Sequence, residues 1–194
     1  GDRWFPLEAD TPLYDHNWFW LPANEKKRKS LDQLMNIYYK SVGHGGVLLL
    51  NSTPNTEGLI PEDDMKAYEA FGREIDRRFA RPLAETAGKG ATVELELPAA
   101  AAINHAILME DYREGERIRE YVLEGLADGQ WKLLAEGTAV GRMKIDAFSS
   151  TLVSKVRIRA TRAAAEPLIR RLAVFQVLGP VPGEQAADRA KMDW

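Results

Sequence analysis

The 194-residue sequence contains no cysteine, which excludes disulfide bonds, thiolate metal sites and cysteine nucleophiles. No stretch approaches the roughly 20 apolar residues of a membrane-spanning helix, and the first residues lack the basic start and apolar run of a secretory signal. Neither sign of charge is in large excess, because the formal net charge is only -3. The sequence therefore gives no general reason to expect nucleic acid or a membrane as a partner, and the compartment stays open.

The composition itself is that of an ordinary globular protein, with 45% hydrophobic and 28% charged residues. These values disfavour disorder and a coiled coil, and they allow a sizeable core. The length is compatible with one domain or with two small ones.

Helical signals occupy the first part of the chain. Ser30 and Gln33 have the spacing of a capping box, and apolar residues then recur at helical intervals until Gly43, which predicts a helix over 31–42. The run 47–50 is the pattern of a strand covered on both faces in a parallel sheet. Pro61 predicts the start of a second helix, whose expected buried stripe is Met65, Tyr68, Phe71, Ile75 and Phe79.

After Pro82 the pattern changes to short alternating runs. Residues 84–90 are interpreted as a linker, and seven runs follow at 93–97, 103–109, 118–123, 130–134, 142–147, 156–160 and 172–175. Turn signals such as Glu114-Gly115 and Asp128-Gly129 separate them. The expected fold is an α/β segment over 1–87, an antiparallel β-sandwich over 88–176 and a tail over 177–194.

The segment "RWFPLEADTPLYDHNWFW" at residues 3–20 gathers aromatic rings around one carboxylate, Glu8. Desolvation among aromatic rings raises the pKa of a carboxyl group and allows it to donate a proton near neutral pH. Aromatic faces also stack on sugar rings, so the pattern fits half of a glycosidase site, which needs two carboxyl groups. The alternative is that Glu8 pairs with Arg3 or a backbone amide and the rings belong to the core.

Several blocks of the sequence occur in the order found in one family. They are Trp4-x-Pro6-x-Glu8-x-Asp10, Trp18-Phe19-Trp20, Tyr38-Tyr39-Lys40-Ser41-Val42-Gly43, Leu48-Leu49-Leu50-Asn51-x-x-Pro54 and Gly58-Leu59-Ile60. With these blocks the chain resembles the C-terminal part of the catalytic domain of retaining α-L-fucosidases. The later blocks Gly115-Glu116-Arg117-Ile118, Gly129-x-Trp131 and Lys155-Val156-Arg157 resemble the galactose-binding-like jelly roll that follows the barrel in these enzymes.

The resemblance implies a (β/α) barrel end over 1–87 and a glycosidase that hydrolyses α-L-fucosides. It implies that Glu8 is the general acid/base and that Trp4, Trp18 and Trp20 wall the sugar pocket. The family's nucleophile is an aspartate on an earlier barrel strand, so the chain alone is expected to be inactive. No cofactor and no metal are expected, and the family's usual compartments are periplasmic, secreted or lysosomal.

Two other hypotheses remain open at this stage. One is a non-catalytic carbohydrate-binding module, which the few aromatic residues of the expected sandwich disfavour. The other is an assembly module, whose exposed barrel edge pairs with the N-terminal half of the barrel or with another copy of the chain. The expected small-molecule partner is a fucosylated glycan. His44, flanked by glycines, is interpreted as a loop residue and not as a ligand.

Overall fold

The computed structural model describes residues 7–182, which form two compact units. The first contains residues 7–42 and 46–77, and the second contains residues 43–45 and 78–179. The expected boundary at residue 87 therefore differs from the observed one, because residues 78–87 lie in the second unit. Within the described part of the chain, no helix is long and apolar enough to cross a membrane.

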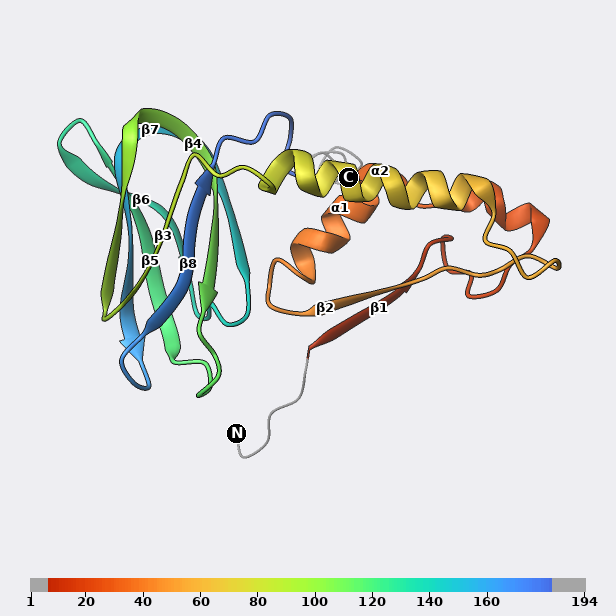
Figure 1. Cartoon of the computed structure of the whole chain (residues 1–194), viewed down its shortest axis with the longest axis horizontal. Helices are drawn as coiled ribbons and strands as arrows, with labels where there is room; N and C mark the ends of the chain where they lie inside the picture. The colour runs from red at the N-terminus through yellow and green to blue at the C-terminus, as the bar shows by residue number, and fades with distance from the viewer. Residues whose placement is uncertain (1–6, 183–194) are drawn as a thin grey trace, which may run out of the picture. The chain divides into compact units, whose positions relative to one another are not determined.

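The first unit contains a two-stranded parallel sheet and two helices (Figure 1). Strand β1 (Glu8–Pro12) pairs with β2 (Val47–Asn51), and Pro12 is opposite Asn51 at their carboxyl ends. Between them lie the 3-10 helix η1 (Pro22–Lys27) and α1 (Leu31–Lys40), which begins with the predicted capping box of Ser30 and Gln33. Two parallel strands do not by themselves form a barrel.

Helix α2 (Glu62–Phe79) follows β2 and matches its expected buried stripe only in part, with Tyr68 and Ile75 half-buried. Phe71 and Phe79 are buried as expected, but Met65 is 48% exposed. The preceding residue, Asp64, has no exposed surface. The helix therefore buries a carboxylate where the apolar pattern predicts a methionine.

The second unit is a six-stranded antiparallel sheet in the order β3-β8-β4-β7-β5-β6. Its strands are β3 (Ala84–Lys89), β4 (Thr92–Glu110), β5 (Ile118–Ala127), β6 (Gln130–Gly137), β7 (Lys144–Ala163) and β8 (Leu168–Phe175). The interpretation of 84–90 as a linker is wrong, because β3 pairs with β8 in this sheet. The described chain is thus mostly antiparallel β-sheet with few helices.

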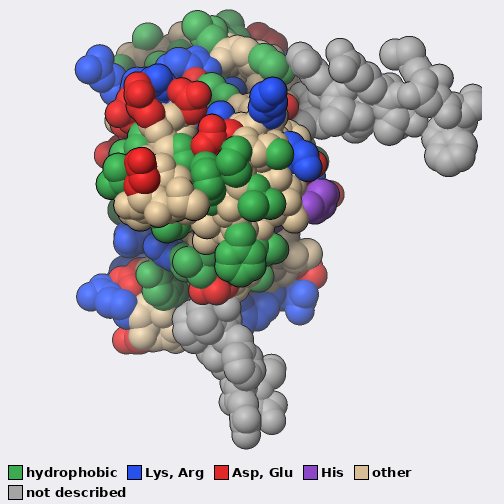
Figure 2. All heavy atoms as spheres, turned by 90° about the vertical axis from the view of Figure 1, so that its right-hand side faces the viewer, with side chains coloured by type: hydrophobic (Ala, Val, Ile, Leu, Met, Phe, Trp, Pro, Cys, Tyr) green, Lys and Arg blue, Asp and Glu red, His purple; other side chains and the backbone are tan. Residues whose placement is uncertain are grey.

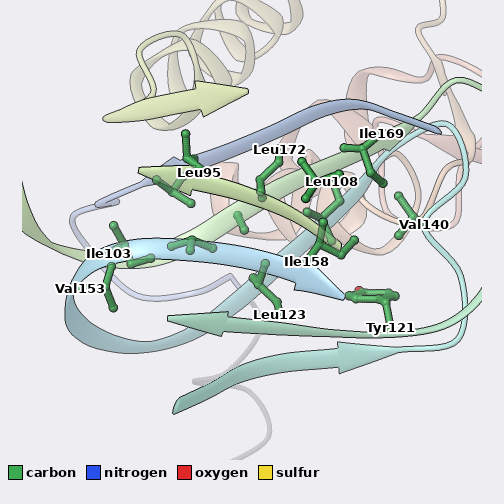
Figure 3. Close-up of a cluster of buried hydrophobic side chains, with 14 of the residues drawn as sticks. Leu95, Ile103, Leu108, Tyr121, Leu123, Val140, Val153, Ile158, Ile169 and Leu172 are labelled. Atoms are coloured by element: carbon green, nitrogen blue, oxygen red, sulfur yellow. The ribbon is translucent and has the colours of Figure 1, made fainter. Parts of the chain in front are cut away.

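Two long strands replace four of the predicted short ones. Residues 93–97 and 103–109 belong to β4, while 142–147 and 156–160 correspond largely to β7. The β4–β7 register shifts between Glu96 and Ala101, so the strands continue through a bulge where the sequence suggests a break. One buried cluster takes side chains from both halves of these strands and from β5 and β8 (Figure 3).

Candidate functional site

Strand β1 carries the expected proton donor. Glu8 is its first residue, and Asp10 lies on the same exposed face because strand side chains alternate. Glu8 is exposed, so the enclosure by aromatic rings inferred from the sequence is not present among residues 7–182. Trp4 and Arg3, the other residues named for this carboxylate, lie outside the described residues.

The segment after β1 carries the two other predicted site residues, Trp18 and Trp20. Trp18 is 46% exposed, and its carbonyl oxygen accepts hydrogen bonds from Asn51 Nδ2 at 3.2 Å and from Thr53 Oγ1 at 3.1 Å. The indole N–H of Trp20 donates to Glu25 Oε1 at 2.9 Å. The loops at the carboxyl ends of β1 and β2 are therefore joined to each other.

Glu8 and the tryptophans occupy different ends of β1. Trp18 follows the carboxyl end of the strand, whereas Glu8 begins it, about 13 Å from Pro12 at that end. In α/β sheets, ligands bind where loops leave the carboxyl ends of the strands. The described residues thus place Trp18 at such an edge and place Glu8 on the strand that leads to it.

A buried cluster that the sequence patterns did not reveal lies beneath this segment. Asp64 Oδ2 accepts a hydrogen bond from the Tyr14 hydroxyl at 2.6 Å, and Asp64 Oδ1 accepts one from Arg28 Nε at 2.7 Å. Desolvation, followed by the hydrogen bond to Asp64, raises the pKa of the Tyr14 hydroxyl well above its usual value. Tyr14 therefore remains a proton donor in this bond at physiological pH.

Exposed hydrophobic side chains accompany the site. Phe19 is 80% exposed, and Leu21 and Leu59 are also exposed. Figure 2 shows a face of the molecule on which hydrophobic side chains gather beside acidic ones. Apolar surface of this kind marks a binding surface more often than scattered apolar residues do.

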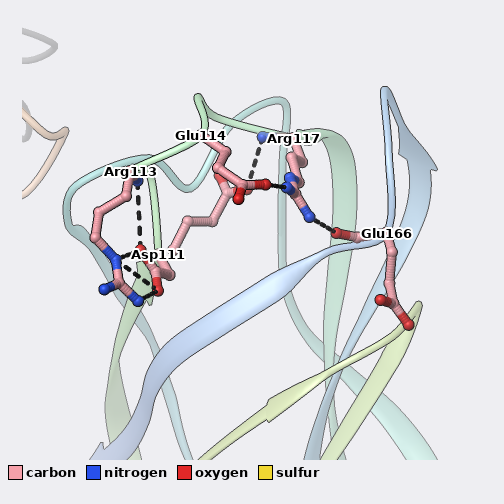
Figure 4. A network of polar contacts seen from close by, with 6 residues as sticks. Asp111, Arg113, Glu114, Arg117 and Glu166 are labelled. Atoms are coloured by element: carbon pink, nitrogen blue, oxygen red, sulfur yellow. Dashed lines mark hydrogen bonds and ion pairs between the residues drawn. The ribbon is translucent and has the colours of Figure 1, made fainter.

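The second unit contains a polar hollow of about 290 Å³, lined by Asp111, Arg113, Glu114 and Leu168. Its charged groups already bind one another (Figure 4). Arg113 forms an ion pair with Asp111 and lowers the pKa of that carboxyl to about 2, while Arg117 pairs with Glu114 and donates to the Glu166 carbonyl at 2.9 Å. The charged side chains of this hollow are therefore explained by the turns that they stabilise, and they give no reason to infer a ligand.

His44 contacts the protein, in agreement with its interpretation as a loop residue. Its Nε2 lies 2.9 Å from Lys144 Nζ, and the neighbouring Gly43 carbonyl accepts a hydrogen bond from the Ile145 amide at 2.9 Å. Within residues 7–182 no group of three or more His, Asp or Glu side chains has the arrangement of a metal site.

Comparison with known proteins gives the family context. No protein-family model matches the sequence. Alpha-L-fucosidase 1 of Arabidopsis thaliana is 28% identical over 212 residues, which cover 90% of this chain and 41% of that protein. The chain spans about two fifths of the length of the curated relatives it matches.

Solved structures agree with this match. The crystal structure of a "putative alpha-L-fucosidase" from Bacteroides thetaiotaomicron is 35% identical with a TM-score of 0.88, covering 90% of this chain and 41% of that one. A glycoside hydrolase 29 family member from an unknown rumen bacterium is 31% identical with a TM-score of 0.81, covering 95% and 36%. The resemblance identified from the sequence is confirmed, and the matched region is the C-terminal part of these proteins.

Proposed function

We propose that this chain, which is related to the α-L-fucosidases, is the C-terminal portion of a retaining glycoside hydrolase that removes α-L-fucose from oligosaccharides or glycoconjugates. The observation that carries the proposal is the match over 90% of the chain with a TM-score of 0.88. The parallel β1–β2 pair and the junction of their carboxyl-end loops support a place at the end of a (β/α) barrel. The second unit is then the β-sandwich that follows the barrel.

In this mechanism Glu8 protonates the leaving glycosidic oxygen and later activates water, as the general acid/base does in retaining enzymes. Trp18 and Trp20, together with Trp4, line the sugar pocket. A retaining mechanism requires a second carboxylate roughly 5 Å from the first. In the related enzymes the resemblance places this nucleophile on an earlier barrel strand, so Asp10 and Asp15 are pocket or loop residues.

The partner required for activity is the N-terminal half of the barrel, with a second copy of the chain as the alternative. Strand β2 supports this part of the proposal, because Val47 is 40% exposed and Leu49 is 46% exposed. A parallel strand rich in leucine and valine is normally covered on both faces. These side chains gain burial when neighbouring barrel strands are supplied. The other partner is a fucosylated glycan substrate.

The test of the function is a comparison of Glu8→Ala with Asp10→Ala in the full-length enzyme. The two residues lie on the same face of the same strand, so they form a matched pair. Loss of a general acid costs about 10²- to 10⁴-fold in rate with leaving groups that need protonation. Glu8→Ala should show this loss and Asp10→Ala should not.

Leaving-group dependence then separates catalysis from folding. With an activated aryl α-L-fucoside, Glu8→Ala should lose much less activity, and azide should restore turnover. Equal losses on both kinds of substrate without azide rescue would assign Glu8 a structural role. If Asp10→Ala instead showed the loss of rate and the rescue by azide, Asp10 would be the acid/base.

A further inference from the structure

The two ends of the segment that carries Trp18 and Trp20 meet at a narrow neck. We call residues 15–27 the aromatic loop. Tyr14 and Arg28 form a β-bridge at its ends, the Asp15 amide donates to the Lys27 carbonyl at 2.8 Å, and the Lys29 amide donates to the Leu13 carbonyl at 2.9 Å. The conformation of the loop therefore depends on what holds this neck.

Asp64 holds both sides of the neck with one carboxylate. Its Oδ2 binds the hydroxyl of Tyr14, which precedes the loop, and its Oδ1 binds Nε of Arg28, which follows the loop. Asp64 itself is wholly buried in the first turn of α2, where the helix dipole favours a negative charge. The neck is thus fixed to a rigid element by two hydrogen bonds to a charged group.

The Lys29 ammonium group also holds the neck, because it donates to the Pro12 carbonyl at 2.7 Å and to the Tyr14 carbonyl at 3.3 Å, but the loop beyond the neck has few contacts with the rest of the unit. Asn24 is its only buried residue, and the Trp18 carbonyl provides the attachment to the loop after β2. Trp20 is bonded to Glu25 within the loop itself, so this contact does not fix the loop to the sheet or to α2. A small change at the neck is therefore expected to move the tryptophans.

We propose that Asp64 is a positioning residue, which holds the aromatic loop in the conformation that places Trp18 and Trp20 for the sugar. The placing of Trp18 and Trp20 against a sugar rests on the proposed function, whereas the anchoring of the loop does not. Asp64 acts through Tyr14 and Arg28 and takes no part in the chemistry. The inference concerns the specificity of the site, because the loop binds the sugar and not the reacting atoms.

Asp64→Asn is the informative substitution, because it changes the number of acceptors without changing the shape. In asparagine one of the two carboxylate oxygens is replaced by an NH2 group, which is a donor, so the partner on that side of the neck no longer faces an acceptor. The bond on the other side loses the charge of the carboxylate. We expect the amides of Asp15 and Lys29, both hydrogen-bonded across the neck, to exchange at least about 10-fold faster in the 194-residue chain.

Tyr14→Phe and Tyr121→Phe provide a matched control that does not depend on the charge. Each removes one hydroxyl that donates to a buried aspartate, since Tyr121 donates to Asp146 at 2.8 Å in the second unit. Both variants should lower the thermal stability of their own unit. Faster exchange at Asp15 and Lys29 should follow Tyr14→Phe and should be absent in Tyr121→Phe.

Kinetics of the full-length enzyme test the link to the sugar. Asp64→Asn and Tyr14→Phe should raise KM for an aryl α-L-fucoside about 10-fold and change kcat by less than about threefold. Asp64→Glu, which retains two acceptor oxygens, should have a KM close to that of the wild type. Unchanged exchange at the neck in both Asp64→Asn and Tyr14→Phe would overturn the anchoring role.

The outcomes also separate this inference from the function. Faster loop exchange with an unchanged KM would overturn the positioning role while leaving fucosidase activity intact. Absence of turnover in the wild-type full-length enzyme would overturn the proposed function. In that case the exchange experiment would still decide whether Asp64 anchors the loop.

Discussion

Buried polar side chains in the second unit are each held by a small set of partners. Both oxygens of the buried Glu110 carboxylate accept backbone N–H groups, Oε1 from Arg117 at 2.8 Å and Ile118 at 3.0 Å and Oε2 from Gly141 at 2.9 Å. His105 is buried with its ring edge-on to Phe79, which also packs against Phe175, and its Nδ1 lies 2.9 Å from Asn104 Oδ1. The free energy of unfolding therefore depends on the protonation state of such groups.

His105 should make the protein less stable in mildly acidic solution. Burial, followed by the nearby charge of Arg78, lowers the pKa of its imidazole from 6.5 to about 4. The pKa of His105 is lower in the folded state than in the unfolded state. The stability that goes with a neutral, buried imidazole is therefore fully present above pH 6.5 and is lost as the pH falls towards 4. The free energy of unfolding should fall by about 3 kcal/mol across this window.

Denaturant unfolding of wild type and His105→Gln between pH 4 and 7 measures this effect. The variant should have a flatter pH profile than wild type. Burial raises the pKa of Asp146, which therefore titrates in the opposite sense, so the difference between the two profiles isolates His105. Parallel profiles would contradict the prediction.

At the scale of elements, the pairing of β5 with β6 depends on a glycine. Gly137 on β6 lies opposite Tyr121 on β5, and a Cβ at this position would lie 2.6 Å from Tyr121 Cε1. The Tyr121 ring is buried and its hydroxyl is bonded to Asp146, so the ring has little freedom to move. Gly137→Ala should therefore cost about 1–3 kcal/mol, as overpacking does elsewhere.

Gly72→Ala is the control for this substitution. Gly72 lies inside α2 with no atom near the added methyl group, so alanine should stabilise the helix by about 0.5–1 kcal/mol. Thermal unfolding of both variants should shift the midpoint in opposite directions. A Gly137→Ala variant as stable as wild type would show that the ring of Tyr121 moves aside.

Elements with strong local signals could be predicted from the sequence. The capping box of Ser30 and Gln33 and the run 47–50 both led to the correct element. Strand β3 was missed because residues 84–89 contain one β-branched residue, and this edge strand is held by its pairing with β8. The long strands were divided because Pro98 and the alanines after it hide a bulge within β4.

The candidate site was only partly accessible to sequence reasoning. The aromatic segment and Glu8 are predicted as site residues because their residue types are distinctive. Asp64 was missed, since an acidic residue in the first turn of a helix is normally explained by the helix dipole. Its partners, Tyr14 and Arg28, are 50 and 36 residues away in sequence, so only the fold brings them together.

At the scale of the whole molecule, the second unit is expected to support the barrel without binding sugar itself. Trp131, the one tryptophan among residues 78–179, has the Arg157 guanidinium 4.0 Å from its ring centroid, and Arg157 is paired with Glu124. A stacked cation occupies one face of this ring, so that face is not available for stacking on a sugar. Titration of the chain with L-fucose should leave NMR shifts of residues 92–175 unchanged, and saturable shifts around Trp131 would refute this.

The two carboxylates of the proposed mechanism belong to different parts of the enzyme. In the proposed function Glu8 supplies the acid/base, and the nucleophile is expected from barrel strands that precede the residues present in this chain. Exposed apolar residues on β2 are expected to cause self-association when those strands are absent. The activity should accordingly need both halves of the barrel.

The most direct test is an assay of the purified chain on an aryl α-L-fucoside, alone and after mixing with a separately produced N-terminal half of the enzyme. The account predicts no turnover by the chain alone and turnover by the mixture, because the retaining mechanism needs two carboxylates from different parts of the barrel. The N-terminal half alone should also be inactive. Turnover by the chain alone that disappears on Glu8→Ala would contradict the account, since Asp10, Asp15 or a carboxylate from a second copy would then supply the nucleophile.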